Sequence, residues 1–322
     1  MTRILTLINL ILLGVLVYIL VYPQMKARQV VEATVVYQDT PGALPLFVAE
    51  QLGLFDSLKV KVTSEEALIG PETVDDIGKG RYQMLYGIDW ANALFRIAVR
   101  PEAYRVAYSV AYSQSNPYAS LVTLRKSKIR SLKDLLLKRI GYPKGTRYNL
   151  ILKHYLKQEG LDPEKVSFIG LLPSEMTTAL DRNLADALLV VEPYRSLVVH
   201  REDVRVLEDA VFSRRIVSPL PVFVGLTSIV NLNLSKAQVQ RVYQATEQAI
   251  RFIREYPDSA AQILRHHFNL PADAPVNLPQ FETYQELDPT RIRAIIAHLK
   301  ETEVLLVDLN PNDFLMTPSD LK

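Results

Sequence analysis

The stretch that decides the fold is residues 33–63, which read ATVVYQDTPGALPLFVAEQLGLFDSLKVKVT. Ala33–Gln38 is rich in β-branched and apolar residues and predicts a strand. Ala43–Phe55 repeats apolar residues at helical spacing and predicts a helix, and Val60–Thr63 predicts a second strand. A strand, a helix and a strand in this order are typical of an α/β protein with parallel strands.

The same alternation continues along the chain on both sides of a break near residues 115–117. Further strands are predicted at Gln83–Ile88, Tyr104–Tyr112, Ala119–Leu124, Arg139–Tyr142, Val166–Gly170, Ala187–Val191 and Val204–Leu207. Helices are predicted at Pro71–Lys79, Trp90–Val99, Ser131–Leu137, Tyr148–Glu159, Pro173–Arg182, Tyr194–His200, Ser235–Tyr256, Ser259–Phe268 and Pro289–Val304. The pattern predicts βαβ units and a largely parallel sheet.

The order of elements predicts two α/β lobes, the second inserted into the first. Lobe 1 is expected at residues 33–116 plus 224–322 and lobe 2 at residues 117–223, joined by crossing segments at Ser115–Ala119 and Arg215–Gly225. Residues 1–32 form a separate N-terminal segment. Such an arrangement places a cleft between the lobes, and clefts at strand carboxyl ends are where ligands bind.

Composition excludes several classes of function. Of the 322 residues, 48% are hydrophobic and 22% charged, which argues against a disordered chain, and the net charge is only +2 (37 − 35). No basic block interleaves with aromatic residues, so a nucleic-acid partner is not expected. The chain has no cysteine, which excludes disulfides, thiolate metal sites and cysteine nucleophiles. His266 and His267 are adjacent and would point in different directions on a helix, and no catalytic motif is present, so neither metal, cofactor nor catalysis is predicted.

The N-terminus carries a long apolar segment. Ile4–Tyr22 spans 19 residues without a charge, and a helix of that length rises about 28 Å, close to the hydrocarbon thickness of a bilayer. The sequence that follows, from Val21 to Lys26, lacks the small residues of a cleavage site. An uncleaved membrane anchor is therefore favoured over a cleaved signal. The positive charges on the two sides, Arg3 against Lys26 and Arg28, nearly balance and leave the orientation open.

Several segments resemble a known family. They are Pro45–Phe55, Ser131–Pro143, Gly160–Val166, Pro173–Leu180, Ala185–Ala187 and Glu192–Pro193. In this order they resemble the substrate-binding proteins of ABC importers in the nitrate, sulfonate, taurine and thiamine-precursor group, the SsuA/THI5-like or NMT1 family. The resemblance covers roughly residues 33 to 300.

The resemblance implies a type II periplasmic-binding fold, whose two lobes close on a small molecule, and delivery of that molecule to an ABC permease with its ATPase. It also implies that the globular part lies outside the cytoplasm, in the periplasm or on the extracellular face of the cytoplasmic membrane. Two alternatives stay open: a membrane-tethered sensing or accessory domain, and an enzyme on the same scaffold. The yeast enzymes of the superfamily carry a cysteine-rich iron motif that this chain lacks.

Three carboxylates follow predicted strands and are candidate ligand-binding residues. Asp39 follows the first strand, Asp89 the third, and Glu192 the run Ala187–Val191, so each should emerge at a strand's carboxyl end. Asp39 and Asp89 could equally cap the next helix. Glu192 could accept hydrogen bonds from a ligand amine or ring N–H, or pair with Arg195, and the structural role is preferred.

The turn Gly145-Thr146-Arg147 is a second candidate, because it precedes a predicted helix whose first N–H groups favour an anion. The alternative is an ordinary helix start, with Thr146 as its cap and Arg147 solvated. This turn also resembles the ligand-anchoring turn of the family's second lobe.

Aromatic residues form the third candidate group. Six tyrosines lie between Tyr82 and Tyr118, and Trp90, Tyr112 and Tyr118 flank predicted strand ends and the crossing segment. A flat ring with a hydroxyl suits a planar ligand, although rings at even spacing along a strand can also serve only the core. Together the candidates predict a small organic ligand that is planar, anionic or both.

Overall fold

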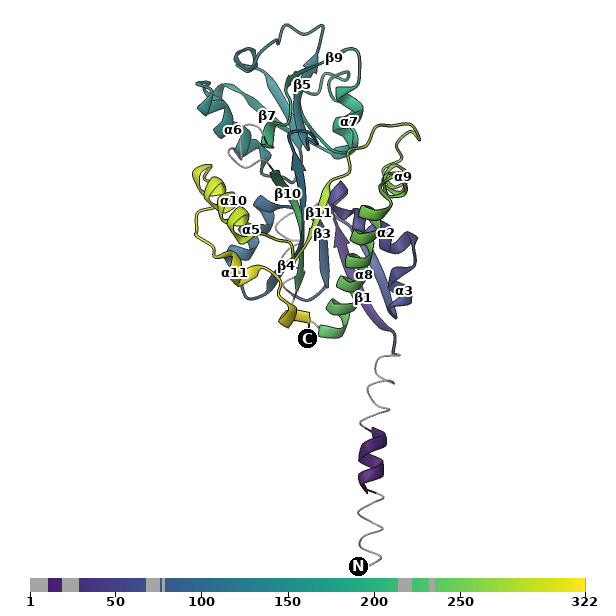
Figure 1. Ribbon diagram of the computed structural model, residues 1–322. Coiled ribbons are helices and arrows are strands. Elements are labelled where there is room, and N and C mark those ends of the chain that lie inside the picture. Colours follow the sequence, from purple (N-terminus) through teal and green to yellow (C-terminus); the bar gives the residue numbers. More distant parts are fainter. Residues whose placement is uncertain are drawn as a thin grey trace, which may run out of the picture.

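The protein contains two separate mixed β-sheets, with helices packed around them (Figure 1). The computed structural model describes residues 11–18, 29–67, 76, 79–213, 222–231 and 235–321. For residues 173 and 222–229 it describes the backbone and not the side chains. Most of the predicted helix at residues 71–79 and most of the second crossing segment, residues 215–225, lie outside this range.

The first sheet has six strands in the order β11-β4-β10-β3-β1-β2. They are β1 (Val31–Tyr37), β2 (Val60–Glu66), β3 (Met84–Asp89), β4 (Tyr104–Ser113), β10 (Val222–Asn231) and β11 (Gln280–Thr283). Strand β1 pairs in parallel with β2 and β3, whereas β10 is antiparallel to both β3 and β4, and β11 is antiparallel to β4. The prediction of a largely parallel sheet is therefore wrong for this half.

The second sheet has five strands in the order β7-β6-β8-β5-β9. They are β5 (Ala119–Leu124), β6 (Arg139–Pro143), β7 (Ser167–Leu171), β8 (Ala187–Val191) and β9 (Val204–Glu208). Strand β6 is parallel to β7 and β8, while β5 runs antiparallel to β8 and β9. Strands β3, β5 and β8 are buried along their whole length, as expected for strands covered on both faces.

Helices cover both faces of the first sheet (Figure 1). Helices α2, α3 and α8 lie on one side of it and α5, α10 and α11 on the other. These helices, together with α9, which follows α8, have the bounds α2 (Leu44–Gln51), α3 (Leu54–Ser57), α5 (Trp90–Val99), α8 (Lys236–Glu255), α9 (Pro257–His267), α10 (Pro289–Glu301) and α11 (Pro311–Phe314). Around the second sheet lie α6 (Tyr148–Gln158) and α7 (Tyr194–Val199).

Short 3-10 turns complete the structure at η1 (Pro41–Ala43), η2 (Leu132–Leu135), η3 (Pro163–Lys165), η4 (Pro173–Glu175) and η6 (Pro318–Leu321). Two of them replace predicted helices. At η2 the Asp134 carboxylate accepts hydrogen bonds from both the N–H and the hydroxyl of Ser131, but the segment closes as a 3-10 turn. The predicted helix Pro173–Arg182 is η4 followed by turns.

Residues 11–18 form a helix in the middle of the predicted anchor Ile4–Tyr22, and the two ends of that anchor lie outside the described residues. Figure 1 shows this helix apart from the sheets, and its apolar side chains are exposed, from 48% for Val15 to 60% for Tyr18. Among the described residues, no helix has the length and apolar character needed to cross a membrane.

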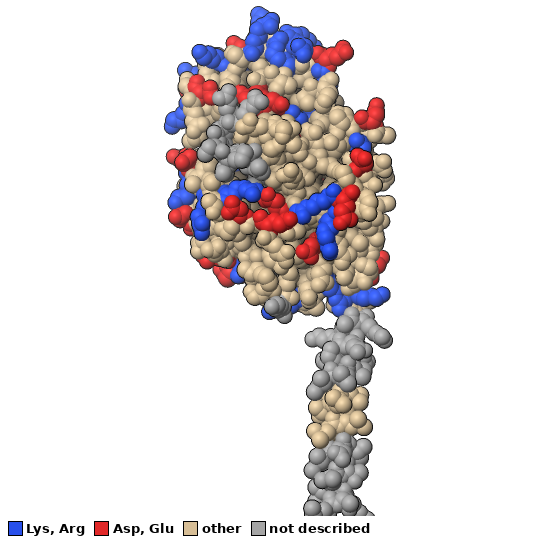
Figure 2. All heavy atoms as spheres, in the orientation of Figure 1, with Lys and Arg blue, Asp and Glu red and all other residues tan. Residues whose placement is uncertain are grey.

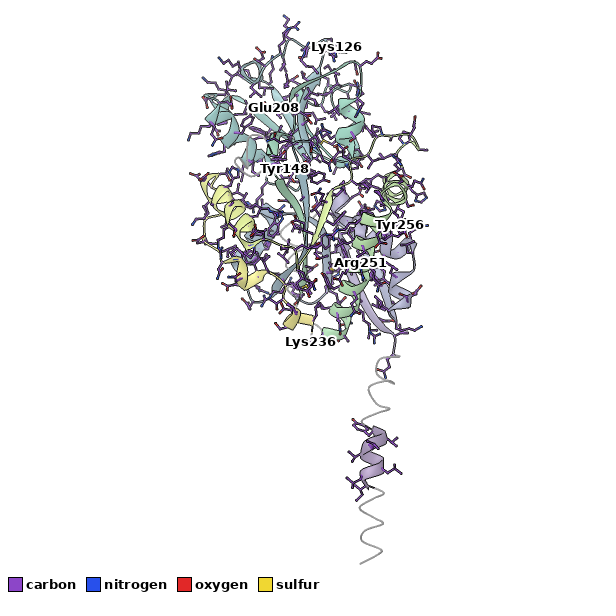
Figure 3. All side chains as sticks on the ribbon, viewed as in Figure 1. Lys126, Tyr148, Glu208, Lys236, Arg251 and Tyr256 are labelled. Carbon is purple, nitrogen blue, oxygen red and sulfur yellow. The ribbon has the colours of Figure 1, made fainter. Side chains whose placement is uncertain are left out.

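Charges of both signs are spread over the surface. Figure 2 shows Lys and Arg gathered at the end of the molecule formed by the second sheet, where Figure 3 places Lys126, while both signs alternate in a band over the first-sheet half. This distribution fits the small net charge and gives no continuous basic face in that view.

Candidate functional site

A small cavity lies where the two sheets face each other. Its volume is about 20 Å³, and most of the residues around it lie at or after the carboxyl ends of β1, β3, β6 and β8, while Tyr118 precedes β5. It is lined by Gln38, Asp39, Thr40, Asp89, Tyr118, Pro143, Lys144, Thr146, Tyr148, Val191, Glu192 and Tyr194. Figure 3 shows one of them, Tyr148, in the middle of the molecule between the sheets.

The segment after β1 brings three polar side chains to the cavity. Thr40 donates a hydrogen bond from Oγ1 to the carbonyl oxygen of Gly87 at 3.1 Å, which ties this segment to β3. The Asp39 carboxylate lies 3.1 Å from Nε2 of His267, and the ring of His267 stacks on Phe47 with centroids 3.5 Å apart. Helix α9 therefore fixes the position of Asp39.

Asp89 ends β3 and caps α5. Its Oδ1 accepts a hydrogen bond from the backbone N–H of Asn92 at 3.0 Å, and its Oδ2 accepts from the Asn92 amide at 2.7 Å. The side chain is only 1% exposed, and burial raises the pKa of this carboxyl to about 6, against the opposing effect of the Asn92 hydrogen bonds. The capping role considered from the sequence is present, in a residue that also lines the cavity.

Glu192 follows β8 and belongs to a buried ion-pair network. Its Oε1 lies 3.3 Å from Nη1 of Arg195 and accepts hydrogen bonds from Ser196 Oγ at 2.8 Å and Asn277 Nδ2 at 3.0 Å. Burial raises the pKa of Glu192 to about 7, and the Arg195 charge acts in the opposite direction. Arg195 also pairs with Asp209 at 2.7 Å. Glu192 thus forms the pair with Arg195 that the sequence suggested, and it also lines the cavity.

The turn after β6 meets the first-sheet half of the molecule through α5. Asn92 donates from Nδ2 to the carbonyl oxygen of Gly145 at 2.8 Å and accepts at Oδ1 from Arg147 Nε at 3.2 Å. The Arg147 guanidinium lies 4.0 Å from the centre of the Phe95 ring. Because burial withdraws it from water, the pKa of Arg147 is lowered. We call these four residues, Asn92, Phe95, Gly145 and Arg147, the α5 clasp.

A cluster of aromatic rings closes the other side of the cavity. The Tyr118 ring lies 4.9 Å from that of Tyr112 and 6.2 Å from that of Phe212, and Phe212 lies 4.8 Å from Tyr148. Burial raises the pKa of Tyr112, Tyr118 and Tyr148, so all three hydroxyls stay protonated at neutral pH. Trp90, also buried, donates its indole N–H to Ser109 Oγ at 3.0 Å.

The nine candidates from the sequence are therefore placed in two groups. Five of them line the cavity: Asp39, Asp89, Tyr118, Thr146 and Glu192. The other four lie beside it without lining it: Trp90 and Tyr112 among buried side chains, and Gly145 and Arg147 in the α5 clasp. Thr146 Oγ1 accepts from the Tyr148 N–H at 3.4 Å, but the N-cap of α6 is Arg147, which forms no side-chain capping bond, so Thr146 is not the cap that the sequence suggested.

Sequence reasoning missed several lining residues, among them Gln38, Lys144, Tyr148 and Tyr194. Gln38 could have been found by the rule that selected Asp39, because it directly precedes Asp39 at the same strand end. Tyr148 and Tyr194 are the first residues of α6 and α7, so a search of helix starts at the same edge would have included them.

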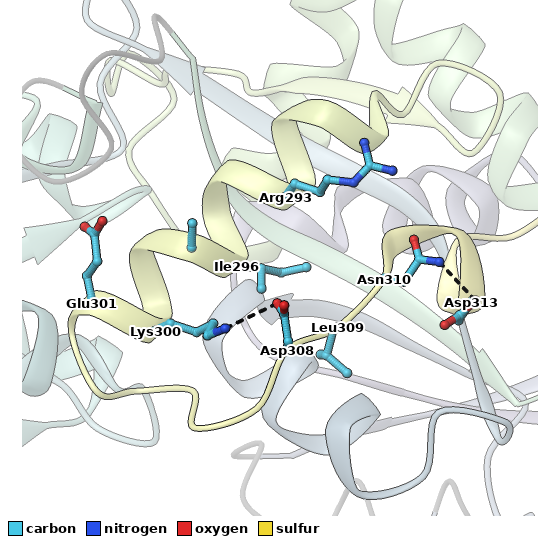
Figure 4. Close-up of a pocket in the computed structure, with 9 residues that line it drawn as sticks. Arg293, Ile296, Lys300, Glu301, Asp308, Leu309, Asn310 and Asp313 are labelled. Carbon is cyan, nitrogen blue, oxygen red and sulfur yellow. Dashed lines mark hydrogen bonds and ion pairs between the residues drawn. The ribbon is translucent and has the colours of Figure 1, made fainter.

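A larger hollow lies on the outside of the molecule (Figure 4). Its volume is about 850 Å³, and all its lining residues come from residues 293–313, around α10 and α11. Lys300 and Asp308 form an ion pair there at 3.4 Å. We place the candidate site at the small cavity instead, because strand ends of both sheets and buried polar groups converge there.

The cavity offers carboxylates, an amide, hydroxyls and aromatic faces, a set that can hold a small organic molecule by hydrogen bonds and stacking. No group of three or more potential metal-ligating side chains occurs within the described ranges.

Comparison with known proteins identifies the fold. The chain is similar to the periplasmic aliphatic sulphonate binding protein SsuA of Escherichia coli, with 16% identity and a TM-score of 0.65, covering 88% of this chain and 97% of that one. It is similar to the ligand binding component of an ABC-type import system from Staphylococcus aureus, solved with zinc bound, at 15% identity, a TM-score of 0.68 and coverage of 90% and 98%. It is also similar to the Candida albicans CA3427 gene product, described as having the generic periplasmic binding protein structural fold. The identity is 16% and the TM-score 0.65, and the match covers 90% of this chain and 99% of that one.

The chain thus has the α/β fold of periplasmic binding proteins. A comparison with curated proteins finds no match. The family model described as NMT1/THI5 like matches residues 40–260, which span more than half of the sequence and all the lining residues of the cavity except Gln38 and Asp39. On this match, the chain belongs to the NMT1/THI5-like family.

Proposed function

We propose that this protein is the extracytoplasmic solute-binding component of an ABC importer, which binds a small organic ligand between two lobes and delivers it to a permease. The observation that carries the proposal is the convergence of polar side chains from four strand ends, two in each sheet, on one cavity. Family membership and the binding proteins among its structural neighbours support it.

In this proposal the two lobes are residues 33–116 with 224–322 and residues 117–223, each built on one of the two sheets. Contacts between them hold the molecule closed: the α5 clasp on one side, and the Asn277–Glu192 hydrogen bond of 3.0 Å on the other. A ligand with contacts to both lobes would favour this closed state, and only its differential affinity for the two states can drive closure.

The cavity of about 20 Å³ holds roughly one water molecule, so a larger ligand enters only after the lobes separate. Asp39, Asp89, Tyr118, Thr146 and Glu192, together with Gln38, Tyr148 and Tyr194, would then touch the ligand. Gly145 and Arg147 would act in closure, and Trp90 and Tyr112 would support the walls.

We also propose that Ile4–Tyr22 anchors the protein in the membrane as an uncleaved helix, with the globular part on the periplasmic or extracellular side. The 19 uncharged residues and the exposed apolar side chains of residues 11–18 support this proposal. Carbonate extraction of membranes from expressing cells tests it: an anchored chain stays in the pellet and begins at Met1 by intact mass. A chain found in the supernatant with a shortened N-terminus would contradict it.

The solute-binding proposal is tested by purifying the full chain in mild detergent and measuring native mass spectra before and after denaturation. We expect a copurifying small molecule that rebinds stoichiometrically and unchanged. Chemical conversion of that molecule by the protein would favour an enzyme on the same scaffold. If the protein binds the compound but cells that lack the protein still take the compound up at the normal rate, a sensing or accessory domain is favoured.

A further inference from the structure

One acceptor that lines the cavity has no hydrogen-bond partner among the described residues. Oε1 of Gln38 is buried and forms no hydrogen bond with any residue in the described part of the chain. The whole side chain is 6% exposed and lines the cavity. A buried carbonyl oxygen without a donor destabilises the protein, and a ligand N–H would remove that penalty.

The charges around the cavity are mostly negative. Asp39, Asp89 and Glu192 line it, against the single lining cation Lys144, whose side chain is exposed. Glu192 is already paired with Arg195, so Asp39 and Asp89 are the carboxylates that an oxyanion would meet. Asp89 accepts hydrogen bonds from Asn92 at both oxygens, but a carboxylate offers about four acceptor positions and so keeps capacity toward the cavity. An oxyanion placed here would meet like charges in a poorly hydrated site.

The arginines that could attract an oxyanion are held elsewhere. Arg147 lies over the Phe95 ring and donates to Asn92. Arg195 is shared between Glu192, Asp209 and Ser120, the last at 2.6 Å from Nε. The start of α6 would favour an anion, yet the Tyr148 N–H there already donates to Thr146 Oγ1.

We infer that the cavity selects a planar ligand with N–H donors, such as an amidine or a protonated amino-heterocycle, and rejects sulfonates and carboxylates. This inference rests on the proposed function. The N–H groups meet Gln38 Oε1 and the Asp89 carboxylate, and the ring lies against the faces of Tyr118, Tyr148 and Tyr194. The same three aromatic rings also favour a positively charged ligand, because a cation is attracted to the face of an aromatic ring.

Three probes with one shared ring test the selection: benzamidine, benzoate and benzenesulfonate. Each is titrated into the full chain in detergent by isothermal calorimetry, after denaturation and refolding to remove any copurified compound. We expect benzamidine to bind at least tenfold more tightly than either anion.

Two variants test which residues produce the preference for benzamidine. Asp89→Asn removes a charge and keeps an acceptor for the helix cap, and Gln38→Leu removes the unpartnered acceptor without a change of charge. Each should weaken benzamidine binding at least tenfold. Glu202→Gln, at an exposed turn, is the matched loss of one carboxylate and should leave binding unchanged.

The outcomes separate the two proposals. Tighter binding of benzoate or benzenesulfonate, or benzamidine binding that both variants leave intact, would overturn the inference and leave the solute-binding function standing. If no probe binds, the copurified compound decides: an N–H donor or cation supports the inference, and an oxyanion overturns it. A protein that neither binds a probe nor releases a compound would overturn the proposed function and the inference with it.

Discussion

Gly87 is a residue of β3 that lies against the segment after β1. A Cβ atom there would lie 2.5 Å from Thr40 Oγ1 and 3.2 Å from the backbone nitrogen of Ala43. Its φ is +77°, in the left-handed region that favours glycine. Glycine at this position therefore lets Thr40 bond to the Gly87 carbonyl and places Asp39 beside the cavity.

Gly87→Ala should lower the free energy of unfolding by about 2–4 kcal/mol, through backbone strain and the clash with Thr40 and Ala43. Gly160→Ala is a matched control, because Gly160 has the same φ of +77° but nothing within 4 Å of its added Cβ. The control should lose only about 1 kcal/mol. Urea unfolding followed by circular dichroism measures both. Equal losses would show that the close contact is unimportant.

Single residues also show what the sequence could and could not reveal about the site. Asp89 and Glu192 were predicted because a polar residue at the end of an apolar run must emerge at a strand's carboxyl end, and this needs only local information. Arg147 was considered as a ligand contact or as a solvated side chain, yet it lies on Phe95, which is 52 positions earlier in the chain. No spacing rule reports such a contact, because it depends on how the two halves pack.

Among the elements, α5 forms hydrogen bonds that join the two halves of the molecule. Its cap, Asp89, orients Asn92, and Asn92 then bonds the turn after β6 at two atoms. The helix also carries Phe95, on which Arg147 rests. One helix start therefore joins the candidate ligand-binding carboxylate to the contacts between the two halves.

Asn92→Ala should shift the protein without ligand toward open forms, because it removes both hydrogen bonds across the interface. The chain has no cysteine, so spin labels can be placed by Lys126→Cys and Lys236→Cys, which lie at opposite ends of the globular part in Figure 3. We expect pulsed electron resonance to show a longer mean distance in the variant.

The control for this experiment is Asn312→Ala, at an exposed position of α11 away from the interface. It should leave the label distance unchanged. If Asn92→Ala gives the same distribution as the control, the α5 clasp does not determine closure.

The elements differ in how far the sequence predicted them. Helices α8 and α10 were expected at nearly their observed bounds, because long amphipathic repeats are a strong local signal. Pro173–Arg182 was wrongly predicted as a helix. Two of its backbone bonds span three residues, as from Thr178 N–H to Glu175 O, and only the one from Arg182 N–H to Thr178 O has the four-residue span of an α-helix among the described bonds of this segment. The Glu175 side chain accepts from the Leu172 N–H. Strand direction was also missed, since β10 returns antiparallel from the other half of the molecule.

At the scale of the whole molecule, two histidines meet across the two halves. The ring of His154 on α6 lies 6.3 Å from that of His298 on α10. His298 Nε2 is buried and has no hydrogen-bond partner among the described residues, and Nδ1 lies 4.0 Å from Glu301. Burial, helped by His154 and opposed by Glu301, lowers the pKa of His298 from 6.5 to about 4.

The sign of the pH effect follows from this shift. Below pH 6.5 the unfolded chain takes up a proton that folded His298 resists until about pH 4, so stability is lost as pH falls through this window. At pH 5 the loss from this residue is about 2 kcal/mol. His298→Gln should lose less stability than the unchanged protein between pH 7 and pH 5, measured by urea unfolding at both values.

His266→Gln provides the control, because His266 is exposed on α9. It should show the same loss of stability with pH as the unchanged protein. Identical pH dependence in all three proteins would mean that His298 does not sense acid in the folded state.

Trp90 has a further use in the study of this protein. It is the only tryptophan in the chain, it follows Asp89 directly, and its indole N–H is fixed on Ser109. Its emission is therefore an intrinsic optical signal from one known point beside the cavity, with no background from other indoles. Rapid-mixing fluorescence on the unlabelled protein can then separate the rate of ligand encounter from the rate of lobe movement, which equilibrium titrations combine into one constant.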